Sequence, residues 1–278
     1  MRIRRSKVLL TGCSIRGWSN GSYDYDTRAG YPGTPGLLVD ASHLIVARTT
    51  LEGGRGAKGA DKDWWADPGD GGTGGPGLLL KGASDVLALG CCGDLFRGGD
   101  GGDGGKDPFS SLRGAGGDGG PGIRVSAGYI EVSGVELQGG EGGYGSPSGN
   151  DGPPYVGNVD VTDPPYPVLD MEGDIHPGSS FDVTVHGLVG DSVILLLSDT
   201  PGWLDLPWRP GPPLSALPGG FFIGFHVGVI GPSGKVAVTL SMLNDPVVRG
   251  FALTSQAALL SGPGTFVLAN AATRIVGE

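Results

Sequence analysis

The sequence predicts an all-β protein in two parts: a parallel β-helix (solenoid) with glycine-rich, polyproline-II-like hairpin insertions, followed by an antiparallel β-sandwich. Three observations support this fold. Similar segments with alternating apolar residues begin at residues 1, 37, 78 and 123. Glycines recur every third residue between these segments, and the last third of the chain holds short apolar runs separated by glycine and proline. We expect solenoid repeats over 1–157, a linker over 158–167 and the sandwich over 168–278.

The repeats align at their apolar positions. Leu37, Val39, Leu44, Val46 and Leu51 correspond to Ile123, Val125, Ile130, Val132 and Leu137, to Met1, Ile3, Val8, Leu10 and Ile15, and in part to Leu78, Leu80 and Val86. Such alternation is typical of strands that bury one face. Strand sets this short cannot bury that face alone, but copies stacked about 4.8 Å apart can. WD-type propeller blades have a similar period but need four strands each, and the glycine-rich half of each repeat leaves too little room.

The first repeat starts abruptly. Met1 aligns with Leu37, Leu78 and Ile123, and each of these three follows a Pro-Gly pair. The sequence therefore predicts that the chain begins inside a repeat and that earlier coils precede it.

The glycine tracts run out to a polar or aromatic tip and return. A three-residue period matches a polyproline-II helix, which has three residues per turn and a rise of about 3.1 Å. Glycine in register leaves a bare edge where backbones can approach, and bundling of neighbouring hairpins would offset the entropy that glycine loses on ordering. We predict these structural glycines: Gly53, Gly56, Gly59, Gly71, Gly74, Gly77, Gly98, Gly101, Gly104, Gly116, Gly119 and Gly122.

Other uses of glycine fit less well. Collagen needs long uninterrupted Gly-X-Y, a flexible linker would lack register, and the stretch 231–236 lacks the spacing of a nucleotide-binding loop. Calcium-binding nonapeptides carry an apolar residue two positions after the aspartate, which the third tract lacks. Asp100, Asp103 and Asp107 are the calcium candidates, but we predict no metal or cofactor and expect Asp100 and Asp103 to be solvated.

Charge and motifs narrow the function classes. The net charge of −10 argues against a nucleic-acid partner, and no apolar run approaches the ~18 residues of a membrane span. Cys13, Cys91 and Cys92 form an odd set without zinc spacing, so we expect small buried or partly buried thiols. No GxSxG, HExxH or clustered His/Cys motif occurs, and we predict no enzymatic activity.

After the Pro-rich stretch 158–168 the pattern changes to sandwich-like strands. Phe181, Val183 and Val185, for example, alternate with polar residues. The expected strands span 180–186, 192–198, 221–230, 235–243, 251–260 and 265–276.

These strands carry a resemblance. "GSSFDVTVHG", "GKVAVTLSML" and "FVLANAATRIV" resemble a β-sandwich module at the C-termini of secreted and surface proteins of planctomycetes and myxobacteria. In that module a Gly-x5-Gln-Ala strand, here 250–257, precedes a closing Leu-(Ser/Ala)-Asn-Ala strand, here 268–271. The upstream repeats are similar to right-handed parallel β-helix regions of the same kinds of protein. The resemblance implies an extracellular or cell-surface location and no defined activity.

Aromatic residues at the predicted hairpin tips are the candidate contact residues: Tyr23, Tyr25, Trp64, Trp65 and Phe109. They either fold back onto a hairpin, hiding apolar area, or contact another subunit or a glycan. We expect an extracellular structural protein that assembles with copies of itself into a surface layer, fibre or filament, because an open solenoid end exposes strand edges. The alternative is a carbohydrate-binding or carbohydrate-processing β-helix that uses the aromatic tips.

Overall fold

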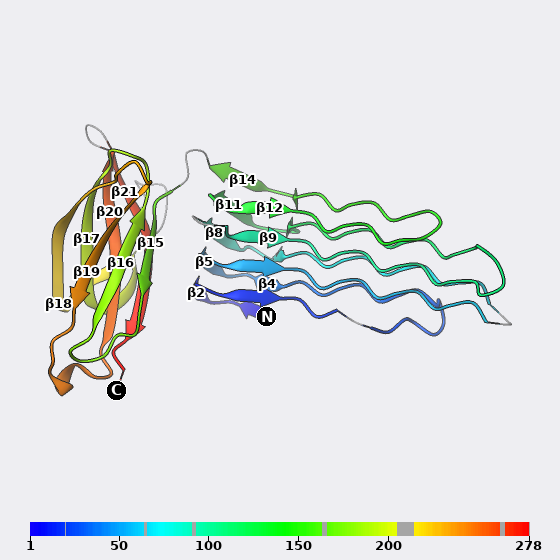
Figure 1. Ribbon diagram of the computed structural model, residues 1–278, viewed down its shortest axis with the longest axis horizontal. Helices are drawn as coiled ribbons and strands as arrows, with labels where there is room; N and C mark the ends of the chain where they lie inside the picture. Colours follow the sequence, from blue (N-terminus) through cyan, green and yellow to red (C-terminus); the bar gives the residue numbers. More distant parts are fainter. Residues whose placement is uncertain are drawn as a thin grey trace. The chain divides into compact units, whose positions relative to one another are not determined.

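The computed structural model describes residues 1–19, 21–63, 66–90, 93–162, 166–204, 214–261 and 265–277, without the side chains of 200–204, 214–222 and 265. In the described residues the chain is all-β, and its one helical element is the short 3-10 helix η1 (Pro246–Val248) (Figure 1). Two units are separate, Met1–Val161 and Thr162–Glu278, and we describe each by itself.

The first unit contains three parallel sheets (Figure 1). The first sheet has the order β1 (Arg2–Arg4), β4 (Leu37–Asp40), β7 (Leu78–Lys81), β10 (Ile123–Val125) and β13 (Tyr155–Val156). The second has the order β2 (Lys7–Thr11), β5 (His43–Ala47), β8 (Asp85–Leu89), β11 (Tyr129–Ser133) and β14 (Val159–Thr162). The third has the order β3 (Ser14–Arg16), β6 (Thr50–Glu52), β9 (Leu95–Arg97) and β12 (Glu136–Gln138). Each full repeat therefore contributes one strand to each sheet, in the same order.

Equivalent apolar residues of successive repeats pair in register. Leu37 pairs with Leu78, which pairs with Ile123, and all three are fully buried. In the third sheet Leu51 pairs with Phe96, the largest fully buried side chain of the chain's described part. Alternation sends these side chains to one face, where they form a single core. The register matches the repeat alignment derived from the sequence.

The predicted linker 158–167 begins later than expected. Residues 159–162 form β14, the last strand of the second sheet, and Val159 packs against the core of the first unit.

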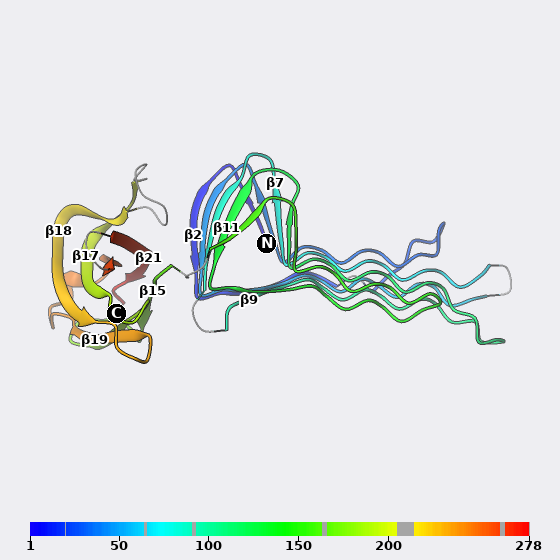
Figure 2. The same ribbon diagram turned by 90° about the horizontal axis from the view of Figure 1, so that it is seen from above.

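Four hairpins each run from a strand of the third sheet to a strand of the first sheet, and we number them by their ranges: hairpin 1 (17–36), hairpin 2 (53–77), hairpin 3 (98–122) and hairpin 4 (139–154). Figure 2 shows their outgoing and returning tracts as two rows lying side by side. Gly53, Gly56 and Gly59 each donate an N–H at 2.9 Å to the carbonyls of Arg97, Asp100 and Asp103. The hydrogen bonds thus repeat every third residue along the tracts.

The N–H groups at the three positions of a triplet point in different directions, where Gly53, Gly56 and Gly59 are counted as first positions. The first-position N–H bonds to the next hairpin, as Gly56 N–H does to the Asp100 carbonyl. The second-position N–H bonds to a tract running the opposite way, as Gly102 N–H does to the Gly72 carbonyl at 2.8 Å. Third-position residues such as Arg55 lie at the surface. The interior of the bundle is therefore made of backbone.

The second unit consists of two antiparallel sheets around a separate core. One sheet has the order β15 (Val168–Glu172), β16 (Ser180–His186) and β19 (Lys235–Ser241). The other has the order β18 (Leu214–Val229), β17 (Ser192–Leu204), β20 (Ala252–Ser261) and β21 (Thr265–Ile275). Val183, Leu195 and Ala257 are fully buried between them.

Strand β15 was not expected from the sequence, because four consecutive residues from Val168 to Met171 are buried and no alternation marks a strand. Asn270 on β21 holds it in place. Its Oδ1 accepts the Leu169 N–H at 2.8 Å, and its Nδ2 donates to the Leu169 carbonyl at 3.0 Å. The fully buried Asn270 therefore supplies side-chain partners to one residue of this strand.

Candidate functional site

The predicted structural glycines occupy first positions of the triplets. A Cβ added at any of the twelve would lie 1.8–2.6 Å from a backbone carbonyl oxygen. At Gly74 it would meet the Gly99 oxygen at 1.8 Å, and at Gly98 the Gly120 oxygen at 1.8 Å. Real side chains do not approach atoms this closely, and the obstructing atoms are backbone. Glycine is therefore required at these positions for packing.

Second positions point toward the preceding hairpin. A Cβ at Gly99 would lie 2.0 Å from the Gly54 oxygen, and one at Gly140 would lie 2.0 Å from the Gly99 oxygen. Ala57 and Ala60 of hairpin 2 depart from glycine here; both donate to hairpin 1, and both are buried.

The third-position aspartates are not solvated decoration, contrary to the expectation from the sequence. Asp100 Oδ1 accepts the Glu141 N–H at 3.0 Å and the Arg97 Nη2 at 2.8 Å. Asp103 Oδ1 accepts the Tyr144 N–H at 3.1 Å and an Arg55 nitrogen at 3.3 Å. Third-position N–H groups receive a carboxylate of the neighbouring hairpin, so these charges add bonds between tracts.

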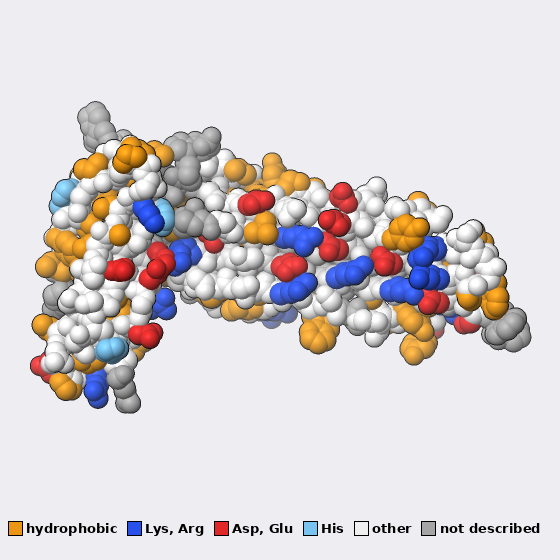
Figure 3. Space-filling view, viewed as in Figure 1, with side chains coloured by type: hydrophobic (Ala, Val, Ile, Leu, Met, Phe, Trp, Pro, Cys, Tyr) orange, Lys and Arg blue, Asp and Glu red, His pale blue; other side chains and the backbone are white. Residues whose placement is uncertain are grey.

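The same arrangement recurs along the bundle. Asp61, Asp70 and Asp118 accept the N–H groups of Lys106, Ala115 and Asn150 at 2.7–2.8 Å. Lys58 donates to the Asp61 carboxylate, and this bond and that from the Lys106 N–H hold the pKa of Asp61 below its ordinary value. In Figure 3 acidic and basic side chains alternate along this part of the molecule.

Asp107, the third calcium candidate, organises the tip of hairpin 3. Its carboxylate accepts the Ser110 hydroxyl at 2.6 Å, the Phe109 N–H at 2.9 Å and the Lys62 Nζ at 3.0 Å. These hydrogen bonds, led by that from Ser110, lower its pKa to about 2. Among the residues with described positions, no group of three His, Cys, Asp or Glu side chains could hold a metal ion.

One cation connects each pair of neighbouring tips. Arg28 of hairpin 1 donates to the Asp63 carboxylate at 2.5 Å and to the Asp61 carbonyl of hairpin 2. Lys62 of hairpin 2 reaches Asp107 of hairpin 3. The next contact along, from Arg113 of hairpin 3, places its guanidinium 4.6 Å from the centre of the Tyr144 ring. Noncovalent side-chain contacts thus join each hairpin tip to the next, from hairpin 1 to hairpin 4.

The predicted aromatic contact residues are spread over separate tips. Tyr23 and Tyr25 pack against each other on hairpin 1, with ring centres 5.5 Å apart, yet Tyr25 remains 87% exposed. Phe109 on hairpin 3 is 69% exposed. Trp64 and Trp65, together with Cys91 and Cys92, lie outside the described residues. Cys13 is half-buried, and its Sγ donates to the Thr11 carbonyl at 3.3 Å.

The sequence patterns did not identify two further exposed aromatic residues, Trp18 and Tyr31. Both stand at second positions of hairpin 1, equivalent to Gly54 and Gly72 of hairpin 2. Trp18 is 75% and Tyr31 40% exposed. Aligning the tracts triplet by triplet would have found them, because they replace the glycines of the other hairpins.

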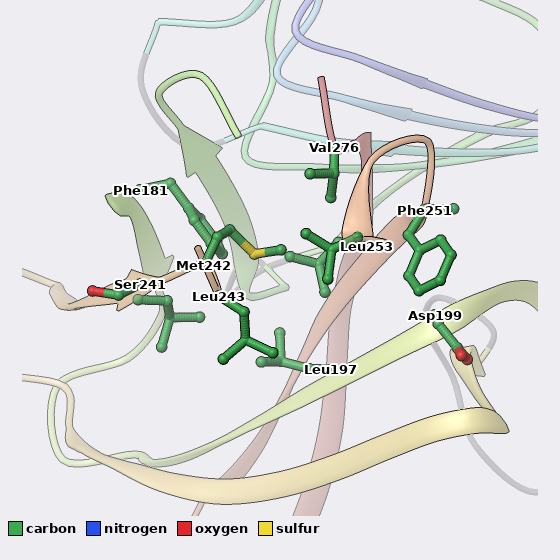
Figure 4. Close-up of a pocket in the computed structure, with 12 residues that line it drawn as sticks. Phe181, Leu197, Asp199, Ser241, Met242, Leu243, Phe251, Leu253 and Val276 are labelled. Atoms are coloured by element: carbon green, nitrogen blue, oxygen red, sulfur yellow. The ribbon is translucent and has the colours of Figure 1, made fainter. Parts of the chain in front are cut away.

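The second unit has an apolar cavity of about 380 Å³ between its sheets. Figure 4 shows the side chains of Phe181, Met242, Leu253 and Val276 lining it, with Asp199 among its residues. Its lining offers little polar chemistry, so the cavity identifies no reaction.

The comparisons with known proteins name no relative. No protein-family model, curated protein or solved structure matches this chain. The search for membrane spans found, within the described residues, no helix long and apolar enough to cross a bilayer.

Proposed function

We propose that the first unit is a parallel β-solenoid with polyproline-II-like hairpins, that the second is a β-sandwich, and that the chain is an extracellular, non-enzymatic structural protein. The in-register parallel pairing of equivalent strands supports the solenoid. The three-residue period of the hydrogen bonds supports the hairpin conformation. A bundle of backbone tracts joined by hydrogen bonds suits a structural role, which depends on a stable shape rather than on catalysis.

The observation that carries this proposal is the state of the solenoid ends. Within the described residues, β1, β2 and β3 are terminal strands at one end of the three sheets, and β13, β14 and β12 are terminal at the other. Terminal strands present unpaired backbone groups that add further strands. We propose that copies of the chain use these ends to assemble into a layer, fibre or filament.

Assembly is tested by light scattering coupled to size-exclusion chromatography and by negative-stain microscopy of the purified chain over a concentration series. Polymers or defined oligomers that grow with concentration are expected. Monodisperse monomers throughout would contradict the proposal. The extracellular location is tested separately, by surface proteolysis of intact cells that produce the protein.

Carbohydrate binding at the hairpin tips is the second candidate. The exposure of Tyr25 and Phe109 on a cross-linked support favours it, because exposed aromatic groups usually contact a partner. Binding to a glycan array that is lost in Tyr25→Ala/Phe109→Ala would support this role. Tyr155→Ala is the control, since Tyr155 is also exposed but lies on β13.

A further inference from the structure

Hairpin 1 ends the bundle on one side through its side chains. At the second-position glycines of hairpins 2 to 4, an added Cβ would lie 1.8–2.3 Å from a carbonyl oxygen of the preceding hairpin. Hairpin 1 carries Trp18, Tyr31 and Thr34 at these positions. These side chains are larger than glycine, so a further hairpin in the same register could not lie against them.

Hairpin 4 ends the bundle on the other side. First positions of the returning tracts are glycine in hairpins 1 to 3, but in hairpin 4 they are Ser148, Asp151 and Pro154. Asp151 Oδ1 accepts the Gly142 N–H at 2.9 Å, which caps a donor that points away from hairpin 3. The first-position glycines of its outgoing tract, Gly139 and Gly142, are half-buried, whereas Gly98 and Gly101 of hairpin 3 are buried.

The aromatic side of hairpin 1 is held in place. Thr34 donates its N–H to the Trp18 carbonyl at 3.1 Å, and the Thr34 hydroxyl accepts the Trp18 N–H at 2.7 Å. Tyr31 donates its N–H to the Ser22 carbonyl and accepts the Ala57 N–H. Two exposed rings therefore stand on a fixed backbone, which lowers the entropy lost when they are buried by a partner.

The sheets end on a step. The first and second sheets have a fifth layer, β13 and β14, whereas among the described residues the third sheet ends at β12, the strand that precedes hairpin 4. A second copy that paired β1 and β2 with this fifth layer would hold its hairpin 1 two layers above hairpin 4. The empty layer is about 4.8 Å deep, the spacing of neighbouring strands, and admits an aromatic ring lying flat.

The two ends carry opposite charge. The first three strands and their connections, residues 1–16, contain five cationic residues and no acidic one: Arg2, Arg4, Arg5, Lys7 and Arg16. Residues 129–162 contain five acidic residues and no lysine or arginine: Glu131, Glu136, Glu141, Asp151 and Asp160. Complementary charge steers encounter and suppresses like-to-like docking.

The acidic residues also affect the titration of a neighbouring tyrosine. Desolvation, together with the hydrogen bond to Asp160 and the charges of Glu131 and Asp85, raises the pKa of Tyr129 to about 12.

We infer that the chain assembles head to tail, with the basic end of one copy docked on the acidic end of the next and with Trp18 and Tyr31 filling the layer above hairpin 4. This inference rests on the proposed self-assembly. The two surfaces differ, so the contact is heterologous and leaves a free basic and a free acidic end at every stage. Repetition of one contact then produces a filament.

Charge-reversed variants test the polarity of the contact. Arg5→Glu/Arg16→Glu reverses the basic end, and Glu136→Lys/Glu141→Lys reverses the acidic end. We expect either variant alone to remain monomeric and an equimolar mixture to form heteromeric dimers or longer oligomers, measured by light scattering. Unchanged melting curves would show that each variant folds. If the charges only stabilise the ends of a single chain, mixing would restore nothing, and the inference would fail.

The aromatic contact is tested with Trp18→Ala/Tyr31→Ala. Burial of two aromatic side chains predicts a loss of association of at least about tenfold, whereas Tyr25→Ala, at the hairpin tip, should assemble as the unaltered chain does. Polymers of the unaltered chain that persist in all these variants would refute this docking mode while leaving self-assembly intact. A monomeric unaltered chain would refute both. A glycan that binds the monomer through Trp18 would assign the face to carbohydrate and overturn the inference.

Discussion

The hairpin bundle and the C-terminal unit fill their interiors in opposite ways. Between the tracts lie glycine backbones whose N–H groups bond to carbonyls of neighbouring tracts, as Gly102 does to Gly72. Between the sheets of the second unit lie branched side chains such as Val183 and Leu195. The bundle is therefore destabilised when a Cβ is added to a buried glycine, and the C-terminal unit is destabilised when atoms of a buried side chain are removed.

Gly74→Ala is the substitution expected to have the largest effect. The new methyl carbon would lie 1.8 Å from the Gly99 oxygen and 2.7 Å from the Gly120 nitrogen. Both obstacles are backbone, so the loss should exceed the ~3 kcal/mol typical of overpacking a side-chain core. Chemical denaturation of the full chain, followed by hydrogen exchange of hairpins 2 and 3, measures it.

Gly21→Ala is the matched control, since a Cβ there meets nothing within 4 Å. It should leave stability unchanged or raise it by up to about 1 kcal/mol, because alanine restricts the unfolded chain. Equal effects of the two alanines would show that the bundle does not depend on backbone contact.

Leu195→Ala tests the opposite case. Leu195 is fully buried in the core of the second unit, and its truncation should cost about 2–5 kcal/mol. The two core clusters share no residue, so hydrogen exchange should accelerate in the second unit and stay unchanged in the hairpins. Val229→Ala is the control, because Val229 is 54% exposed. Loss of protection in the hairpins as well would mean that the units fold as one.

The same contrast explains what could be predicted from the sequence. Alternating apolar residues and glycines three apart are local patterns, and they identified the strands of the repeats and the period of the hairpins. The importance of Trp18 and Tyr31 depends on which triplet position faces the preceding hairpin, and only the hydrogen-bond scheme defines that direction.

Long-range partners account for the other differences. Asp100 bonds to an N–H 41 residues away, so nothing local distinguishes it from a solvated aspartate. Strand β15 depends on Asn270, 101 residues beyond Leu169. In the second unit the pairing is antiparallel and non-local, and its unexpected strand reflects that.

Acid should loosen the tip of hairpin 3. The pKa of Asp107 is lowered from 3.8 to about 2, so its carboxylate stabilises the folded tip above pH 3.8, and this contribution is lost as the pH falls toward about 2. Hydrogen exchange at 106–113 should accelerate over this window in the unaltered chain. Asp107→Asn should show fast exchange already at neutral pH, with Asp26→Asn as an exposed control. If hydrogen-exchange protection at the tip does not change with pH, Asp107 does not organise the tip.

The smallest effect is expected from the side-chain contact between the tips of hairpins 3 and 4. The Arg113 guanidinium lies 4.6 Å from the Tyr144 ring centre, and such an exposed cation–π contact contributes about 0.5–1 kcal/mol. A double-mutant cycle with Arg113→Ala and Tyr144→Ala should give a coupling energy in this range, while Tyr144→Phe keeps the ring and should preserve it. A coupling energy near zero would show that this contact does not stabilise the tips. Backbone hydrogen bonds between the hairpins, such as that from Gly104 N–H to the Tyr144 carbonyl, would then hold the tips together.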